Sequence, residues 1–437
     1  MVEAIGIIVF VLLIAFSIAA HELGHLVPAK RFGVRVTDYM IGFGPTVWSM
    51  QRGETRYGIK AFPLGGYIKM IGMLPPARGA TRSGGGRLST LVEDARRQSL
   101  ADIGPGDEDR VFYRLPVRKR MVIMLGGPVM NLVLAFLLFA IVLVGIGTPQ
   151  PTLALDAIVP CTPTATVPSG APLPSGRCPS GSVEAPAAAA GLRPGDSIVA
   201  VNGVPMAEWA DVTGALVPRG GQAVTLTVMP ADGAAAREVP IEVATIERPV
   251  LDSEGVPTGQ TEPGGFIGVR PAFDYVPQPW TAVPSTMWAI TKASVVALVS
   301  LPVRLYELVS QTLIGGGERA VDGPVSVVGA SRIGGEIAAR DEPFEAKAAG
   351  FLGLLASLNL FLFLFNLLPI LPLDGGHVAG AAFEGIRRRI ANVRGRPDPG
   401  PVDVARLLPV AYVVAAALIA MGVIVIWADL VKPISIG

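Results

Sequence analysis

The sequence predicts a mainly α-helical polytopic membrane protein with four transmembrane segments and one inserted β-rich domain outside the cytoplasm. Of its 437 residues, 51% are hydrophobic and only 16% are charged, which is too apolar for a soluble chain of this length. Four segments carry the run of about 20 apolar residues that a spanning helix needs. Basic and acidic residues are divided unequally among the connections, which assigns each connection to one side of the membrane.

The predicted order of parts follows from these segments and charges. In sequence the chain divides into a first transmembrane helix (1–28), a cytoplasmic loop (29–120), a second transmembrane helix (121–147), an extracytoplasmic domain (148–275), an extracytoplasmic surface helix with its connection (276–345), a third transmembrane segment (346–374), a cytoplasmic loop (375–406) and a fourth transmembrane helix (407–430).

Lys and Arg near the ends of spans stay in the cytoplasm. Residues 29–120 hold 17 basic and 8 acidic residues, and residues 375–408 hold 6 and 3, so both regions are assigned to the cytoplasm. Residues 148–284 hold 6 basic and 13 acidic residues, as in an exported region. The amino terminus then lies outside. A cleaved signal peptide is the alternative for the first segment, but no basic residue precedes its apolar run.

Two apolar segments need individual interpretation. Residues 285–309 contain Lys292, Pro302 and Arg304, and a crossing there would move the basic 375–406 loop outside, so we predict a helix on the outer membrane surface. The third transmembrane segment is interrupted by Pro369 and Pro372, which predicts an unwound end. Unwound backbone is tolerated at membrane depth only where protein or water satisfies its polar groups.

The extracytoplasmic region predicts a small β-rich module. A turn at residues 193–196 precedes an alternating strand that ends at Asn202-Gly203, and further strands are expected at 223–228, 239–244 and 266–269. The run from Ala187 to Gly203 resembles a PDZ domain of the kind attached to bacterial proteases. This resemblance implies that the domain docks peptides by strand addition. The alternative is that the domain is a structural spacer. Cys161 and Cys178 predict a disulfide in an oxidising compartment, with free thiols as the alternative.

In the first cytoplasmic loop, residues 78–109 are rich in Gly, Arg and Ser. We interpret this segment as flexible or disordered.

The chemistry is concentrated in the first segment, in the run His21-Glu22-Leu23-Gly24-His25. Histidines four residues apart share one face of a helix, so His21 and His25 can bind one metal ion with Glu22 beside it. The alternative, a polar helix end at the interface, does not explain this spacing. Ionisable groups in a spanning helix are costly and therefore usually functional. The pattern predicts one Zn2+ per chain and Glu22 as the general base.

A catalytic zinc ion needs a third protein ligand. Asp374 and His377 both follow the interrupted third segment and reach the same cytoplasmic edge as His21. The residues alone do not rank these two candidates.

Together these motifs resemble the site-2 protease family of intramembrane zinc metalloproteases, of the RseP type. The resemblance rests on the His21–His25 helix, the segment from Asn366 to Gly375 and the PDZ-like domain between them, and shorter matches extend it. These matches are Gly42–Pro45, Pro63–Met70, Gly126–Pro128 with Asn131, and Gly323–Val325. The resemblance implies metal ligation by His21, His25 and Asp374, and so ranks Asp374 above His377.

The same resemblance implies a reaction and its partners. A single-span membrane protein, typically an anti-sigma factor trimmed first by a site-1-type protease, is cut within its transmembrane segment in a bacterial inner membrane. The site would lie near the cytoplasmic side. Residues 63–70 would form a membrane-dipping β-hairpin that pairs with the unwound substrate through Gly65, Gly66 and Tyr67, with Asn366 also contacting it.

Two other classes of function are weaker alternatives. A membrane-anchored PDZ adaptor has no reason to retain His21, Glu22, His25 and Asp374 together, and a metal transporter would want more polar spans. The net charge of +1 gives no indication of nucleic-acid binding.

Overall fold

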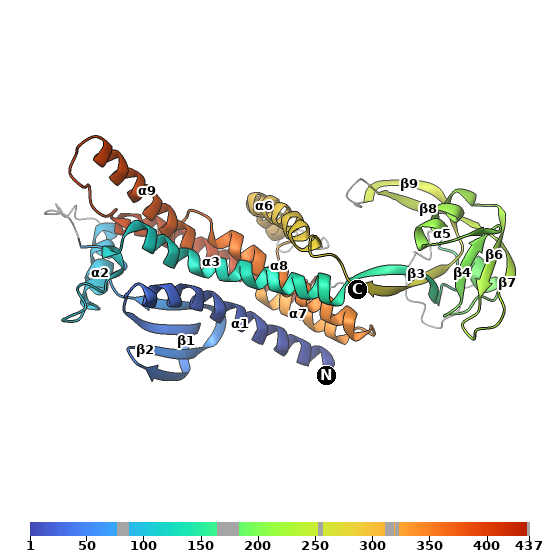
Figure 1. The fold of residues 1–437 in the computed structure, drawn as a ribbon, viewed down its shortest axis with the longest axis horizontal. Helices are drawn as coiled ribbons and strands as arrows, with labels where there is room; N and C mark the ends of the chain where they lie inside the picture. Colours follow the sequence, from blue (N-terminus) through green and yellow to red (C-terminus); the bar gives the residue numbers. More distant parts are fainter. Residues whose placement is uncertain (77–86, 164–182, 252–256, 311–318, 320–322, 435–437) are drawn as a thin grey trace. The chain divides into compact units, whose positions relative to one another are not determined.

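The computed structural model describes the chain except for residues 77–86, 164–182, 252–256, 311–318, 320–322 and 435–437 (Figure 1). The chain divides into two compact units. The first consists of Met1–Ile146 together with Pro277–Gly437, and the second is Gly147–Val276.

The first unit is a bundle of helices with one β-hairpin. Its helices are α1 (Val2–Arg31), α2 (Arg87–Ala101), α3 (Val117–Ala140), α6 (Ala282–Val309), α7 (Val327–Ala339), α8 (Phe344–Asn366), α9 (Asp374–Val393) and α10 (Leu408–Val431). A π-helical turn, Ile141–Ile146, extends α3. The hairpin joins β1 (Val36–Arg52) to β2 (Thr55–Met70).

Five helices of this unit are long and apolar enough to cross a membrane, so the chain is a multi-pass membrane protein. They are Val2–Arg31, Val117–Ile146, Ala282–Val309, Phe344–Asn366 and Val404–Val431. Four of them cover the four predicted transmembrane segments. The fifth, Ala282–Val309, is α6, which the sequence places on the membrane surface; the count of four spans therefore stays a prediction.

The two ends of α6 contact helix ends that lie on one side of the bundle. Helices α3 and α10 start together, because Glu384 binds both Arg120 near the start of α3 and the Val402 N–H before α10. Val283 in the first turn of α6 packs among residues at the far end of α3. Leu308 in its last turn packs at the far end of α10. This arrangement favours the predicted surface placement.

The unwound end of the third predicted segment is confirmed. Helix α8 ends at Asn366, and residues 367–373 form turns before α9 begins at Asp374. Prolines 369 and 372 lack backbone N–H donors, which accounts for the interruption.

One interpretation of the cytoplasmic loop is wrong in part. Residues 78–109 were expected to be flexible or disordered; residues 78–86 lie outside the described part of the chain, but Arg87–Ala101 form α2. Arg96 of this helix is buried and donates two hydrogen bonds to the Asp403 carboxylate, at 2.9 and 3.0 Å. The helix forms because a distant segment supplies its ionic partner, which local composition does not reveal.

The second unit contains the expected β-rich module. Its strands are β3 (Thr148–Ile158), β4 (Ser197–Val201), β5 (Val204–Pro205), β6 (Ala223–Met229), β7 (Arg237–Glu242), β8 (Ala244–Leu251), β9 (Pro257–Phe266) and β10 (Val269–Val276), with short helices α4 (Pro186–Ala189) and α5 (Trp209–Leu216). Six strands form one sheet in the order β10-β3-β4-β6-β7, with β5 on β4, and β8 pairs with β9.

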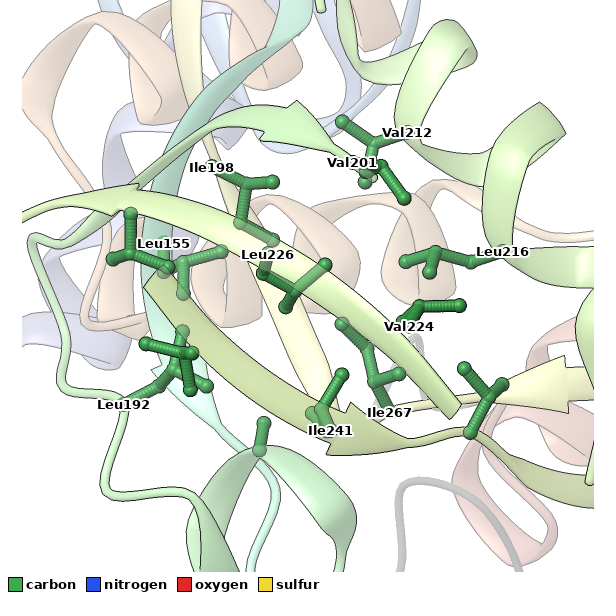
Figure 2. Close-up of a cluster of buried hydrophobic side chains, with 14 residues drawn as sticks. Leu155, Leu192, Ile198, Val201, Val212, Leu216, Val224, Leu226, Ile241 and Ile267 are labelled. Carbon is green, nitrogen blue, oxygen red and sulfur yellow. The ribbon is translucent and has the colours of Figure 1, made fainter. Parts of the chain in front are cut away.

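The core of this unit lies between the sheet and α5 (Figure 2). Ile198 and Leu226 of the sheet are fully buried, and Val212 of α5 is buried with them. The predicted Asn202-Gly203 turn is confirmed, since both residues have positive φ between β4 and β5, as a tight hairpin requires.

Two other expectations concern this unit. The strand expected at 266–269 is wrong, because Gly268 has a φ of 86° and separates β9 from β10. Cys161 is not a free thiol, but Cys178 lies outside the described residues, so the bridge stays a prediction. The PDZ assignment of the unit also stays a prediction.

Helices α1 and α3 cross at a contact between glycine backbones. A β-carbon at Gly126 would overlap the carbonyl of Gly24, and one at Gly24 would overlap that of Gly126. Small residues of this kind let membrane helices approach closely.

Replacing Gly126 by alanine is therefore expected to force the two helices apart and to lower the free energy of unfolding by roughly 1 to 3 kcal/mol. Thermal unfolding in detergent micelles measures this. Gly145→Ala is the control, because the same helix continues through Gly145 and a β-carbon there meets nothing within 4 Å. Equal stability of the two variants would contradict a close crossing.

Candidate metal centre

Helix α1 presents His21 and His25 on one face, and their Nε2 atoms lie 3.2 Å apart. The Nδ1 atom of His25 is 2.7 Å from the Ile123 carbonyl of α3. A carbonyl only accepts hydrogen bonds, so the His25 proton lies on Nδ1 and the Nε2 lone pair is free to bind a metal ion.

Asp374 joins these two histidines from the other end of the sequence. It is the first residue of α9, and the turns after α8 return the chain to α1. Its Oδ2 lies 3.3 Å from Nε2 of His21 and 3.3 Å from Nε2 of His25.

The donor set fits a zinc ion. Zinc binds imidazole nitrogen and carboxylate oxygen at about 2.0 to 2.2 Å in tetrahedral geometry, which separates neighbouring donors by roughly 3.3 to 3.5 Å. The three separations between His21, His25 and Asp374 are close to this value. Two imidazoles and one carboxylate leave a fourth position open, as in catalytic sites. Among the described residues, these three form the cluster of potential metal ligands.

His377, the rival ligand, does not belong to this cluster. It lies one turn along α9 and lines a cavity of about 20 Å³ together with Arg120 and Glu384. Burial lowers the pKa of its imidazole, so His377 is neutral at physiological pH.

A glycine of α3 makes room for the donor atoms. A β-carbon at Gly127 would overlap Nε2 of His25 and lie 2.6 Å from Nε2 of His21. The sequence shows Gly126 and Gly127 only as a matching motif, without a role. The structure assigns them one: Gly126 permits the helix crossing, and Gly127 permits the imidazoles to meet beneath α3.

Glu22 lies between the histidines and the β-hairpin. Its side chain is buried, and the backbone N–H of Ile68 in β2 lies within hydrogen-bonding reach of its carboxylate. A β-carbon at Gly66 would lie 2.9 Å from Cγ of Glu22. Strand β2 therefore runs directly beside the proposed general base.

A tyrosine of β1 fixes the hairpin to α1. The Tyr39 hydroxyl donates a 2.6 Å hydrogen bond to the Ala19 carbonyl, two residues before His21. Burial raises the pKa of Tyr39 to about 12, so the phenol keeps its proton and remains a donor. This contact is absent from the sequence-based prediction, because no local pattern pairs a strand residue with a helix carbonyl.

The residues proposed for substrate binding differ in how close they lie to Glu22. Gly66 is directly next to the Glu22 side chain. The Tyr67 ring instead stacks on the Phe43 ring, with 6.3 Å between ring centroids. Gly65 has a φ of 137° beside the same Phe43 ring. Asn366 is the last residue of α8 and makes no side-chain hydrogen bond within the described part of the chain.

A buried polar contact one turn above the histidines was not anticipated. The Asn359 amide of α8 donates to the Ser17 hydroxyl of α1 at 3.0 Å, and both side chains are buried. This bond holds α8 against the helix that carries His21. An Asn within an apolar run was the available signal.

Comparison with known proteins identifies similar chains. The model of the family described as Peptidase family M50 matches residues 9–397. The chain is 35% identical to the zinc metalloprotease Rip1 of Mycobacterium tuberculosis H37Rv, with 98% of each chain covered. It is also 35% identical to the protein of that name in Mycolicibacterium smegmatis, with 100% of each covered. Identity to the metalloprotease MmpA of Caulobacter vibrioides is 27%, over 87% of this chain and 86% of that one.

Proposed function

The chain belongs to peptidase family M50, and on that premise we propose that it cuts single-span membrane proteins within their transmembrane segment, using His21, His25, Glu22 and Asp374. It is a membrane-embedded metalloprotease of the site-2 type, a family whose reaction is intramembrane proteolysis, and the family implies zinc as the metal. The proposal adds the residues that act and the substrates on which they act.

One observation carries the assignment of residues. Three donor atoms with zinc-like separations of 3.2 to 3.3 Å meet at an apolar helix long enough to span a membrane. In the proposal His21, His25 and Asp374 hold the ion, which when bound supplies Lewis-acid activation of water and of the scissile carbonyl. The Ile123 carbonyl orients His25, and Gly127 leaves space for the ion's ligands.

Glu22 acts as the general base in this proposal. It follows His21 directly, is buried, and therefore faces little competing bulk water. Its carboxylate removes a proton from the attacking water and later returns it to the leaving amine. The contact with Ile68 and Gly66 holds this carboxylate next to β2.

Strand β2 is proposed to receive the unwound substrate. A transmembrane helix hides its peptide bonds in internal hydrogen bonds, so it must open before attack, and strand addition satisfies the released groups. The exposed apolar side chains of the hairpin, including Val47, Trp48 and Phe62, support its insertion into the membrane. Gly65, Gly66 and Tyr67 would line the bound segment, and Asn366 would contact its backbone.

The proposed substrates are anti-sigma factors already trimmed by a site-1-type protease. The proposed location is a bacterial inner membrane, with the second unit outside and the metal centre near the cytoplasmic side. The unequal distribution of basic residues supports this orientation, because residues 29–120 hold 17 of them.

The proposed function is tested by mapping cleavage in proteoliposomes. Single-span anti-sigma factors from the same cell would be reconstituted with the full chain, each either intact or truncated on its outer side. We expect truncated substrates to be cut at a bond inside the apolar span, as read from product masses. A chelator should stop cleavage and added zinc should restore it.

Two results would count against the proposal. Cutting confined to segments outside the span would argue against intramembrane attack. Equal cutting of intact and truncated substrates would remove the requirement for a prior site-1 cleavage, while leaving the reaction itself in place.

A further inference from the structure

Helix α9 carries an apolar stripe that nothing in the described chain covers. Phe383, Ile386, Ile390 and Val393 are exposed by 58%, 60%, 46% and 82%, at intervals of three or four residues. This spacing places the four side chains on one face of the helix. A continuous apolar face of this kind is typical of a surface that meets a membrane or a partner.

The opposite face of α9 is fixed to the bundle. Glu384 is fully buried, pairs with Arg120 of α3 and accepts a 2.9 Å hydrogen bond from the Val402 N–H. Arg387, beside the stripe, donates to the Pro399 and Gly400 carbonyls of the connection that follows α9, at 3.0 and 2.7 Å. These contacts prevent the helix from rotating its apolar stripe inward, so the stripe remains outward.

Unpaired positive charge lies beside this stripe. Arg389, Arg394 and Arg396 are exposed and make no ion pair with any described residue. Arg388, by contrast, reaches inward to Glu384 at 3.0 Å. The helix therefore separates its arginines: those facing the bundle are neutralised, and those flanking the apolar stripe are not.

The position of α9 decides what covers the stripe. Seven residues separate the end of α8 from the start of α9 at the candidate metal ligand Asp374, and α9 lies at the end of the bundle near α2 (Figure 1). That end carries the basic cytoplasmic segments. An apolar face flanked by unpaired arginines, at the end of a membrane bundle, complements the anionic headgroups and upper acyl chains of the inner leaflet.

We propose that α9 is an interfacial helix that binds anionic phospholipid of the inner leaflet. Phe383, Ile386, Ile390 and Val393 enter the acyl region, and Arg389, Arg394 and Arg396 bind the phosphates. The inference rests on the chain being a multi-pass membrane protein and not on the proposed reaction. Because Asp374 is the first residue of α9, lipid binding would also fix the orientation of that carboxylate.

Native mass spectrometry of the purified full chain measures the lipid binding directly. Phosphatidylglycerol and phosphatidylcholine would be titrated against the wild type and a variant with Arg389, Arg394 and Arg396 changed to glutamine. We expect the variant to bind phosphatidylglycerol about 100-fold more weakly, at roughly fivefold per arginine, with little change for phosphatidylcholine. The control changes Arg193, Arg237 and Arg270 of the second unit to glutamine, which removes the same charge and should leave binding unaltered.

Unchanged phosphatidylglycerol binding in the α9 variant would overturn the proposal, as would equal loss in the control. A photoreactive residue at position 386, in vesicles of the two lipids, tests the apolar stripe. Phospholipid adducts are expected, whereas adducts with a second copy or another protein would show that a protein covers the stripe instead. Zinc content should stay unchanged in the α9 variant, which separates this outcome from failure of the proposed metal centre.

Discussion

Replacing Glu22 by glutamine is expected to lower the rate of peptide-bond cleavage by about 10³-fold or more, since a general base contributes roughly 10² to 10⁴. Glutamine has the same size and still fits between the histidines and Gly66, so the fold should persist. Its amide does not accept the proton that the attacking water must lose. Single-turnover cleavage of a truncated single-span substrate in proteoliposomes measures the rate, and metal analysis of the same samples should find zinc retained.

Glu3→Gln is the matched control, because Glu3 lies in the first turn of the same helix, about five turns before His21, and so does not contact the metal site. That variant should cleave at the wild-type rate. Cleavage by Glu22→Gln within tenfold of wild type would remove Glu22 from the role of base. Loss of zinc from Glu22→Gln would instead indicate that the variant disturbs the metal site, and Glu22→Asp would then distinguish the two effects.

The parts that the sequence predicts well depend on local patterns. The spacing of His21 and His25 fixes their shared face, because a helix repeats every 3.6 residues. The apolar runs predict four of the long helices, and Asn202-Gly203 predicts its turn. Each of these inferences needs only residues that are close together in the chain.

Contacts between distant segments could not be predicted in this way. The Ile123 carbonyl orients His25 from 98 residues away, and β2 reaches Glu22 from more than 40 residues away. The close crossing at Gly24 and Gly126 likewise joins residues that are far apart in the chain. A glycine in an apolar helix signals possible close approach, but it does not name its partner.

Helices α2 and α6 show two further limits of prediction from the sequence. Local composition suggested flexibility for α2, whose helix is stabilised by an ion pair between Arg96 and Asp403. For α6, length and apolarity permit a crossing while Lys292 and Arg304 argue against one. Hydropathy measures transfer into lipid, and it does not report where the two ends of a helix are held.

Replacing Asp374 by alanine is expected to remove zinc from the protein. The variant keeps two imidazoles, whereas catalytic zinc sites use three protein ligands, so occupancy should fall from about one ion per chain to below about a tenth. Asp374 is also the charged member of the cluster, 3.3 Å from both imidazoles, and its loss removes the negative charge that favours a divalent cation. Mass spectrometry of metal content after purification without added zinc measures this without any substrate.

His377→Ala is the control that separates the two candidate ligands. Both residues lie in the first turn of α9, so helix position alone does not rank them, but only Asp374 reaches the histidine pair. The His377 variant should therefore keep its zinc, because it loses a neutral imidazole that faces the cavity with Arg120 and Glu384. Zinc retained by Asp374→Ala and lost by His377→Ala would reverse the assignment. Zinc lost by both variants would mean that the turn from Asp374 to His377 acts as one unit, with His377 holding the carboxylate in place.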